Sequence, residues 1–179
     1  MNEVIECMKT RRSVRGYKPD VMPSDELIRQ VTEAGTYAPT GRGMQSPVIV
    51  AVTARDVRDR LSRMNAEVLG TSSDPFYGAP VVLVVLASRE RPTYIYDGTL
   101  VMGNMMNAAH ALGLGSCWIH RAKEVFASEE GKALLKEWGI EGDYEGIGHC
   151  VIGYPLSDSQ PPAKPRKADY VREVGEVKS

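Results

Sequence analysis

Three arginines and a serine lie within five residues near the start of the chain, in Arg11-Arg12-Ser13-Val14-Arg15. A guanidinium group is a planar, permanently charged fork of donors that suits phosphate and carboxylate oxygens. A second basic cluster, Lys164-Pro165-Arg166-Lys167, lies near the other end of the chain and is stiffened by proline. One basic cluster alone is usually a solvated turn. Two clusters raise the possibility that both ends of the chain bind one anion.

The overall composition is that of a soluble globular protein. The 179 residues are 42% hydrophobic and 25% charged, with a formal net charge of -1, which predicts a single domain over residues 1–179. We expect no nucleic-acid partner, because such proteins usually carry a broad basic surface. We expect no membrane partner, because the longest apolar run, Ala79 to Ala87, is too short to span a bilayer.

The cysteines and histidines lack the spacing of a metal site or a disulfide framework. The cysteines are odd in number and widely separated, at Cys7, Cys117 and Cys150. The histidines are His110, His120 and His149. Buried thiols of a reducing compartment are therefore favoured over disulfides or metal ligands. Residues 1–6 also lack the features of a signal peptide, so we expect a cytoplasmic protein without a metal.

The elements that position the basic stretch are a mixture of helices and strands. Apolar residues at helical spacing predict helices over residues 2–10, 24–38, 55–69, 97–112 and 122–138. Apolar and β-branched runs predict strands over residues 48–52, 81–86, 116–119 and 146–154. This order does not follow strict βαβ alternation, which favours an α+β sandwich over a doubly wound sheet. Residues 155–179 are predicted to form a proline-rich C-terminal arm.

For two of these elements the sequence also predicts burial. The strand at 81–86 is apolar on both faces, which is typical of a central strand covered by helices on both sides. The helix at 97–112 is apolar nearly all round, so it must be buried. In a chain of this size we expect a partner subunit to supply part of its cover.

Several common catalytic motifs are missing from the sequence. It contains no G-x-S-x-G nucleophile elbow, no G-x-G-x-x-G fingerprint and no P-loop. The nearest glycine-rich turn, Gly113-Leu114-Gly115, follows a predicted helix instead of opening one. These absences disfavour a serine hydrolase, a Rossmann dehydrogenase and a P-loop nucleotidase.

Five motifs, in order and at family-like spacing, make essentially the whole chain resemble the FMN-dependent nitroreductase family. They are Arg11-Arg12-Ser13-Val14-Arg15, Ala38-Pro39-Thr40-Gly41-x-x-x-Gln45-x-Pro47, Tyr77-Gly78-Ala79-Pro80, Leu112-Gly113-Leu114-Gly115-Ser116-Cys117-Trp118-Ile119, and Ile152-Gly153-Tyr154-Pro155 with Lys164-Pro165-Arg166. The resemblance implies a nitroreductase-like three-layer α/β/α sandwich with a mixed central sheet and an extended C-terminal arm. It also implies an intertwined homodimer with FMN at the subunit interface.

The resemblance assigns the two basic clusters to the cofactor. The residues implied as phosphate and ribityl ligands are Arg11, Ser13, Lys164 and Arg166. Arg12 is implied as a contact to the ribityl chain or to the edge of the isoalloxazine ring. Arg15 matches a cation near the flavin N1 and O2 edge, where positive charge stabilises the anionic reduced ring.

Two further segments are implied to contact the flavin ring. The loop that meets the ring from the partner subunit is matched by Pro39, Thr40, Gly41 and Gln45. The segment covering one ring face is matched by Trp118, Ile119 and His120, where a main-chain N–H, that of His120, points at N5. Core packing of Trp118 is an equal alternative to ring stacking. His120 could equally be a surface histidine at a strand end.

The resemblance implies an FMN-dependent NAD(P)H oxidoreductase with a ping-pong mechanism. NADH or NADPH would be the electron donor, and a nitroaromatic, a quinone or a related small molecule the acceptor. No side chain is predicted to be catalytic, because the flavin supplies the chemistry. Alternatives are a dehydrogenase, a reductive dehalogenase or a flavin-consuming enzyme of the same fold, and a non-catalytic flavin-binding protein.

The sequence departs from the family at two places. Some members have an asparagine in the loop before the central strand, whereas residues 70–75 of this chain are Gly-Thr-Ser-Ser-Asp-Pro. No flavin ligand is assigned there. The chain also lacks the long insertions that form substrate lids in larger members, which predicts an open pocket.

Overall fold

Strand β2 (Val81–Ser88) lies at the centre of the computed structural model, which describes residues 2–175. It pairs with β1 (Pro47–Val52) on one side and with β4 (Tyr144–Gly153) on the other. Strand β3 (Gly115–Ile119) pairs with the outer side of β4, so the sheet order is β1-β2-β4-β3. The apolar residues of β2 are buried on both faces, which confirms the predicted central strand.

All three strand pairings are antiparallel, whereas a mixed sheet was expected. The register shows the reason at the first pairing, where Val52 lies opposite Val82. The chain between these two residues therefore leaves and re-enters the sheet at the same end, whereas a βαβ crossover would return it to the opposite end. Within residues 2–175, the one parallel contact is an isolated bridge between Ser13 and Ser116.

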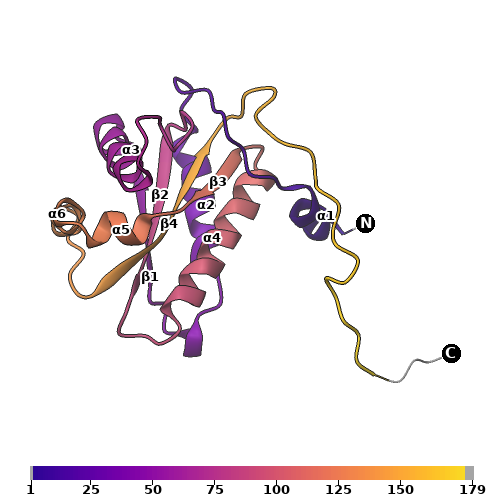
Figure 1. Ribbon diagram of the computed structural model, residues 1–179. Coiled ribbons are helices and arrows are strands. Elements are labelled where there is room, and N and C mark those ends of the chain that lie inside the picture. The colour runs from indigo at the N-terminus through magenta and orange to yellow at the C-terminus, as the bar shows by residue number, and fades with distance from the viewer. Residues whose placement is uncertain (1, 176–179) are drawn as a thin grey trace.

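Helices cover both faces of the sheet, as predicted for an α/β/α sandwich (Figure 1). Side chains alternate along a strand, so Val82, Val84 and Leu86 pack into one core while Val81, Leu83 and Val85 pack into the other. The first core is covered by α3 (Arg55–Leu69), α5 (Ala122–Ala127) and α6 (Glu129–Glu137). The second core is covered by α2 (Asp25–Thr36) and α4 (Tyr94–Ala111).

Local capping sets several helix boundaries. The side chain of Asn2 accepts from the N–H of Val4 and so caps α1 (Glu3–Thr10). The hydroxyl of Ser24 accepts from Leu27 at the start of α2. Helix α3 covers the predicted residues and ends at Gly70, whose φ of 75° is the left-handed conformation that glycine tolerates.

The predicted helix over residues 122–138 is wrong in one respect, because it is two helices. Ser128 has an extended backbone, with φ -69° and ψ 159°. Its hydroxyl accepts from the N–H of Gly131 at 3.0 Å and caps α6. A serine side chain competes for backbone donors in this way, which favours a new helix start over a continuous helix.

Helix α4 is buried on only part of its circumference. Val101, Met102 and Met105 pack against the sheet. Leu100 is 46% exposed and Tyr96 is 71% exposed in the single chain. The predicted helix therefore exists, and part of its apolar surface has no cover within residues 2–175.

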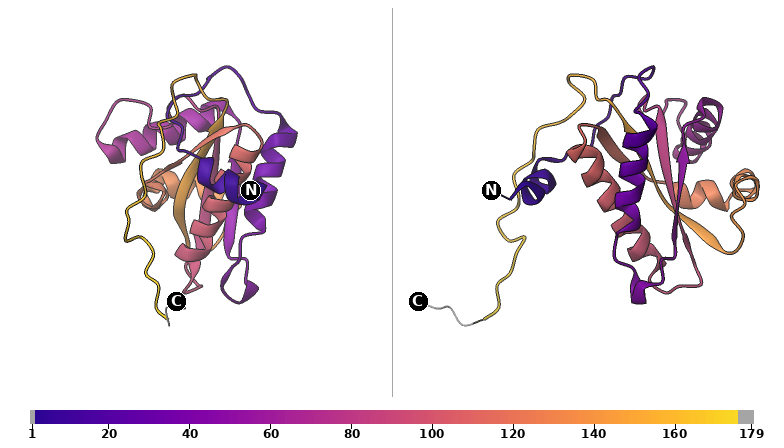
Figure 2. Two further views of the ribbon diagram at one scale, coloured as in Figure 1. Left: turned by 90° about the vertical axis from the view of Figure 1, so that its right-hand side faces the viewer. Right: turned by 180° about the vertical axis from the view of Figure 1, so that it is seen from behind.

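The C-terminal arm leaves the sandwich after β4. Figure 2 shows it running past α1 and away from both helical layers. The side chains of residues 161–175 are exposed. The extended arm that the sequence predicted is thus present in the described part of the chain, through residue 175.

Candidate functional site

The N-terminal basic stretch lies along the edge of the sheet at β3. Ser13 forms a bridge with Ser116, and the N–H of Val14 donates to the carbonyl of Ser116 at 3.0 Å. Val14 is 2% exposed and packs against Gly115, where an added Cβ would lie 2.9 Å from the Val14 side chain. This close approach needs glycine, so the Gly115 position helps to hold the stretch in place.

Arg11 has a buried guanidinium nitrogen without a hydrogen-bond partner. Its Nη1 is buried and contacts no acceptor in residues 2–175. Burial, followed by the positive charges of Arg11 and Arg12, lowers the pKa of the neighbouring His110. A buried cationic donor without an acceptor is costly. The local field is therefore positive, and Arg11 still has a donor available for an anion.

The other residues of the stretch differ in whether their side chains already bind partners within the protein. Nη1 of Arg12 donates to the carbonyls of Lys9 and Arg11, at 2.8 and 2.6 Å. Burial raises the pKa of the Cys117 thiol. Three effects oppose that rise: the positive charge of Arg15, a hydrogen bond with Ser13, and the positive charge of Arg11. Arg15 is exposed and forms no ion pair within the described residues. Ser13 and Arg15 therefore lie near Arg11, whereas Arg12 partly caps α1.

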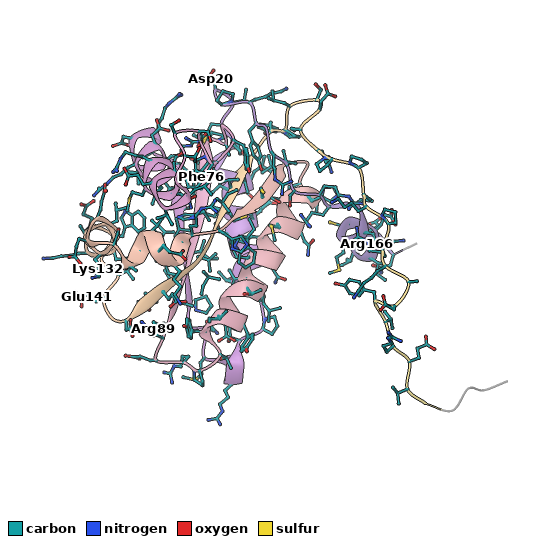
Figure 3. The ribbon with its side chains drawn as sticks, viewed as in Figure 1. Asp20, Phe76, Arg89, Lys132, Glu141 and Arg166 are labelled. Atoms are coloured by element: carbon teal, nitrogen blue, oxygen red, sulfur yellow. The ribbon has the colours of Figure 1, made fainter. Side chains whose placement is uncertain are left out.

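The segment that leads into the C-terminal arm contacts the basic stretch, and the second basic cluster lies beyond these contacts along the chain. The N–H of Leu156 donates to Gly16 at 3.0 Å, and the N–H of Arg15 donates to Ser159 at 3.0 Å. Lys164 and Arg166 lie farther along the arm and are exposed. Nη2 of Arg166 donates to the Lys164 carbonyl at 2.7 Å, and Figure 3 shows Arg166 away from the sheet.

The loop that contains Pro39, Thr40, Gly41 and Gln45 is fixed by Asp97 on α4. Asp97 is 3% exposed, and its Oδ1 accepts from the N–H of Gly41 at 2.9 Å. Its Oδ2 accepts from the Thr93 hydroxyl at 3.0 Å. An added Cβ at Gly41 would lie 2.3 Å from Thr93 Oγ1, so glycine is required for this approach.

A cavity opens beside this loop. Its volume is about 530 Å³. The lining residues include Ala38, Thr40, Gln45, Pro47, Ile49 and Val101. Gln45 is exposed and has a φ of 50°, and its N–H donates to the Thr40 hydroxyl at 3.0 Å. The loop therefore presents an exposed amide side chain at the rim of a partly apolar cavity.

The loop and the basic stretch lie at opposite ends of α4. Gly41 is bonded to Asp97 in the first turns of the helix, while the Thr10 hydroxyl lies 2.9 Å from Nε2 of His110 in the last turn. At 1.5 Å per residue, Asp97 and His110 are roughly 20 Å apart along the axis. Within one chain, the two halves of the predicted cofactor site are thus separate.

The segment at Trp118, Ile119 and His120 ends β3. Trp118 is half-buried and packs over Gly148, where an added Cβ would lie 2.7 Å from Trp118 Nε1. Ile119 is 5% exposed, lies in the core and pairs with His149 of β4. His120 is exposed, and its N–H donates to no atom of residues 2–175.

The loop before the central strand is organised by Asp74. Its carboxylate accepts from the side chains of Arg58 and Ser62 and from the N–H groups of Phe76 and Gly78. Burial alone would raise the pKa of Asp74, but these hydrogen bonds hold it below its ordinary value. Because all these contacts lie within the protein, the role of Asp74 in this loop is explained by structure alone.

Sequence reasoning missed Asp97 and a buried group behind His120. Asn65 on α3 is fully buried, and its Nδ2 donates to the His120 carbonyl at 2.7 Å. Asn65 follows Leu61 by four residues, so it interrupts the apolar face of an amphipathic helix. A polar residue at such a position is a detectable signal. No comparable pattern marks Asp97, because its partner Gly41 lies 56 residues earlier in the chain.

Residues 2–175 contain no group of three or more His, Cys, Asp or Glu side chains arranged to hold a metal ion. Over the same residues, the helices are too short or too polar to cross a membrane.

Comparisons with known proteins agree with this fold. Residues 8–154 match the sequence profile of the Nitroreductase family. A protein of Archaeoglobus fulgidus, provisionally named an NADH dehydrogenase/NAD(P)H nitroreductase, is 29% identical over 164 residues, which is 88% of each chain.

Two solved structures resemble the chain over nearly its whole length. A nitroreductase from Bacteroides fragilis with bound FMN superposes with a TM-score of 0.88 at 26% identity, covering 98% of this chain and 100% of that chain. A provisionally named nitroreductase from Desulfovibrio desulfuricans in complex with FMN gives a TM-score of 0.74 at 25% identity, covering 98% and 99%.

Proposed function

Because the chain belongs to the nitroreductase family, we propose that it is an FMN-dependent oxidoreductase that uses NADH or NADPH to reduce nitroaromatic, quinone or related acceptors. The general oxidoreductase role follows from the family. The donor and the acceptors are proposals, which the provisional name of the Archaeoglobus fulgidus relative and the FMN bound in the Bacteroides fragilis structure support.

The observation that carries the proposal is the orphaned Nη1 of Arg11. A phosphate oxygen would satisfy this buried donor through a charge-assisted hydrogen bond. The hydroxyl of Ser13 and the positive charge of Arg15 both act on the Cys117 thiol, as Arg11 does, and would add to the anion site. The residues present therefore fit the terminal phosphate of FMN.

Other residues would bind or tune the ring. When bound, FMN supplies the hydride-accepting and hydride-donating chemistry. Arg15 would place positive charge at the N1 and O2 edge and so favour the reduced ring. The exposed amide of Gln45 and the unpartnered N–H of His120 would donate to ring atoms. Ile119 would support the segment from the core, where it is buried and paired with β4.

We also propose a homodimer in which each site is shared by two chains. The 39–45 loop and the basic stretch lie at opposite ends of α4, so two copies are needed to bring both to one ring. Helix α1 has no buried residues and exposes Val4, Ile5 and Met8, at 61%, 54% and 57%. Obligate interfaces are commonly built from such apolar surfaces. Lys164 and Arg166 would reach a phosphate in this assembly.

Two measurements test the function. Purified protein is mixed with NADH or NADPH and a panel of nitroaromatic and quinone acceptors, and the loss of reduced-nicotinamide absorbance is followed. Turnover that requires both bound FMN and an acceptor is expected. A yellow protein without turnover would instead indicate a flavin-binding protein. Light scattering should give about twice the chain mass at low micromolar concentration, and a flavin-loaded monomer would contradict the shared site.

A cytoplasmic location is the remaining proposal. Cys7, Cys117 and Cys150 are free thiols in the structure. Unpaired cysteines are typical of reducing compartments. Fractionation of the native cells, with detection of the protein in the cytosolic fraction, tests the location.

A further inference from the structure

Asn65 contacts both residues of the short connection between β3 and α5. This connection is His120-Arg121, because β3 ends at Ile119 and α5 begins at Ala122. Nδ2 of Asn65 donates to the His120 carbonyl at 2.7 Å. Oδ1 of Asn65 accepts from Nε of Arg121 at 3.0 Å. One fully buried side chain on α3 therefore holds the turn from two directions.

The chemistry of the partners fixes the orientation of the Asn65 amide. A carbonyl only accepts and an arginine Nε only donates. The amide nitrogen must therefore face His120, and the amide oxygen must face Arg121. A flipped amide, or a carboxylate in its place, would put an oxygen opposite the His120 carbonyl.

The turn needs such support because its backbone is unusual. Arg121 has a φ of 75°, in the left-handed region that residues with a Cβ rarely adopt. No side chain caps the N-terminus of α5, which Arg121 precedes directly. A strained conformation of this kind persists only where the surrounding contacts determine it.

The peptide held by Asn65 presents its N–H in the opposite direction. A trans peptide is planar, with its C=O and N–H pointing to opposite sides. Because the His120 carbonyl points to buried Asn65, the N–H of Arg121 points away from α3. The N–H groups of His120 and Arg121 both donate to no atom of residues 2–175. The turn thus offers two free main-chain donors in succession.

The environment of Asn65 keeps it in this position. Its Nδ2 lies 3.4 Å from Nδ1 of His149. The His149 ring is fully buried and packs against Phe76 and Phe126, with ring centroids 5.3 and 5.9 Å away. Burial lowers the pKa of His149 to about 3, so the imidazole is neutral at physiological pH. A neutral, tightly packed ring therefore backs the amide.

We propose that Asn65 is a positioning residue that aims the N–H groups of His120 and Arg121 at the flavin ring. This inference rests on the proposed function, because it requires FMN at the face covered by the 118–120 segment. Asn65 itself touches no cofactor atom in this arrangement. It acts through the carbonyl of His120 and the side chain of Arg121.

The test compares variants of the FMN-loaded protein. Asn65→Leu removes both hydrogen bonds at similar volume, and Asn65→Asp opposes the His120 carbonyl with an oxygen. Leu61→Val is the matched control, because it shortens another buried residue of α3, one whose apolar side chain forms no hydrogen bond with the turn. We expect both Asn65 variants to shift the reduction potential and the long-wavelength absorption band of bound FMN, and the control to leave them unchanged.

A second measurement examines the turn without FMN. Backbone order parameters of the His120 and Arg121 amides in the apoprotein should be near the rigid value of about 0.85 in the wild type and should fall toward about 0.6 in Asn65→Leu. Arg121→Gly is a second variant that should fold normally, because glycine accepts the positive φ of this position. It should give a smaller shift in potential than Asn65→Leu, since the bond to the His120 carbonyl remains.

The outcomes separate the two claims. If the wild type binds no FMN, the proposed function fails and the positioning role fails with it. If the wild type binds FMN but neither Asn65 variant changes the potential or the spectrum, the positioning role alone is wrong. A looser turn with an unchanged potential also overturns the role, because Asn65 would then be merely structural.

Discussion

The N–H of Gly41 donates to Oδ1 of Asp97 at 2.9 Å, which ties the 39–45 loop to the start of α4. The same carboxylate accepts from the hydroxyls of Thr93 and Ser46, at 3.0 and 3.4 Å. Its burial means that each of these donors loses its acceptor if Asp97 is replaced. One side chain thus determines the conformation of a loop proposed to reach the ring of the other subunit.

Replacing Asp97 should therefore cost stability. We expect Asp97→Ala to lower the free energy of unfolding by about 2–4 kcal/mol, because it leaves buried donors unsatisfied. Asp143→Ala is the control, since Asp143 pairs with Arg89 at 3.7 Å on an exposed surface and such pairs contribute about 1 kcal/mol or less. Urea unfolding measures both. Equal losses in the two variants would contradict the role of Asp97.

Arg15 should tune the flavin without being needed to hold it. If its charge stabilises the reduced ring, Arg15→Gln lowers the reduction potential of bound FMN while most of the cofactor remains bound. Photoreduction against a reference dye measures the potential. Arg89→Gln, an exposed arginine outside the proposed site, should leave the potential unchanged. An unaltered potential in Arg15→Gln would remove Arg15 from this role.

The C-terminal arm should contribute to phosphate binding across the dimer. Charge-assisted hydrogen bonds are worth roughly 1.5–3 kcal/mol each, so Lys164→Ala with Arg166→Ala should weaken FMN binding by about two to four powers of ten. The double variant should remain a folded dimer that loses colour on gel filtration. Arg172→Ala, outside the basic cluster but on the same arm, is the control. Unchanged affinity in the double variant would show that the arm is not a phosphate clamp.

The buried imidazole of His149 should make stability depend on pH. Burial lowers the pKa of His149 from 6.5 to about 3. Between these values the unfolded chain binds a proton that the folded chain does not, so stability is complete above pH 6.5 and is lost as the pH falls. We expect a loss of about 2 kcal/mol between pH 6.5 and 5. In urea unfolding, His149→Gln should lose less, and an equal loss would rule His149 out as the cause.

Elements with strong local signals were predicted well from the sequence. Helix α3 was predicted at its observed bounds because amphipathic spacing ends at Gly70, and β2 because it is apolar on both faces. The break at Ser128 was missed because a serine hydroxyl inside a helical pattern reads equally as a solvent-exposed residue. Local propensity alone cannot decide between these two readings.

The candidate site was predicted less completely, because its contacts join distant segments. The basic stretch was recognised from its composition, and the structure places Arg11, Ser13 and Arg15 near one thiol. The anchoring of Gly41 by Asp97 and of His120 by Asn65 depends on tertiary packing that periodicity does not encode. The proposed contact of Lys164 and Arg166 with a phosphate would involve a second chain, and so it stays a prediction.

The most direct test compares the affinity of the apoprotein for FMN and for riboflavin, which differ only in the terminal phosphate. If Arg11 supplies the buried donor for that phosphate, the wild type should bind FMN about a hundredfold more tightly or better. Arg11→Met should lose most of that preference while keeping its affinity for riboflavin. Equal affinities of the wild type for FMN and riboflavin, or an undiminished preference in Arg11→Met, would contradict the proposed site.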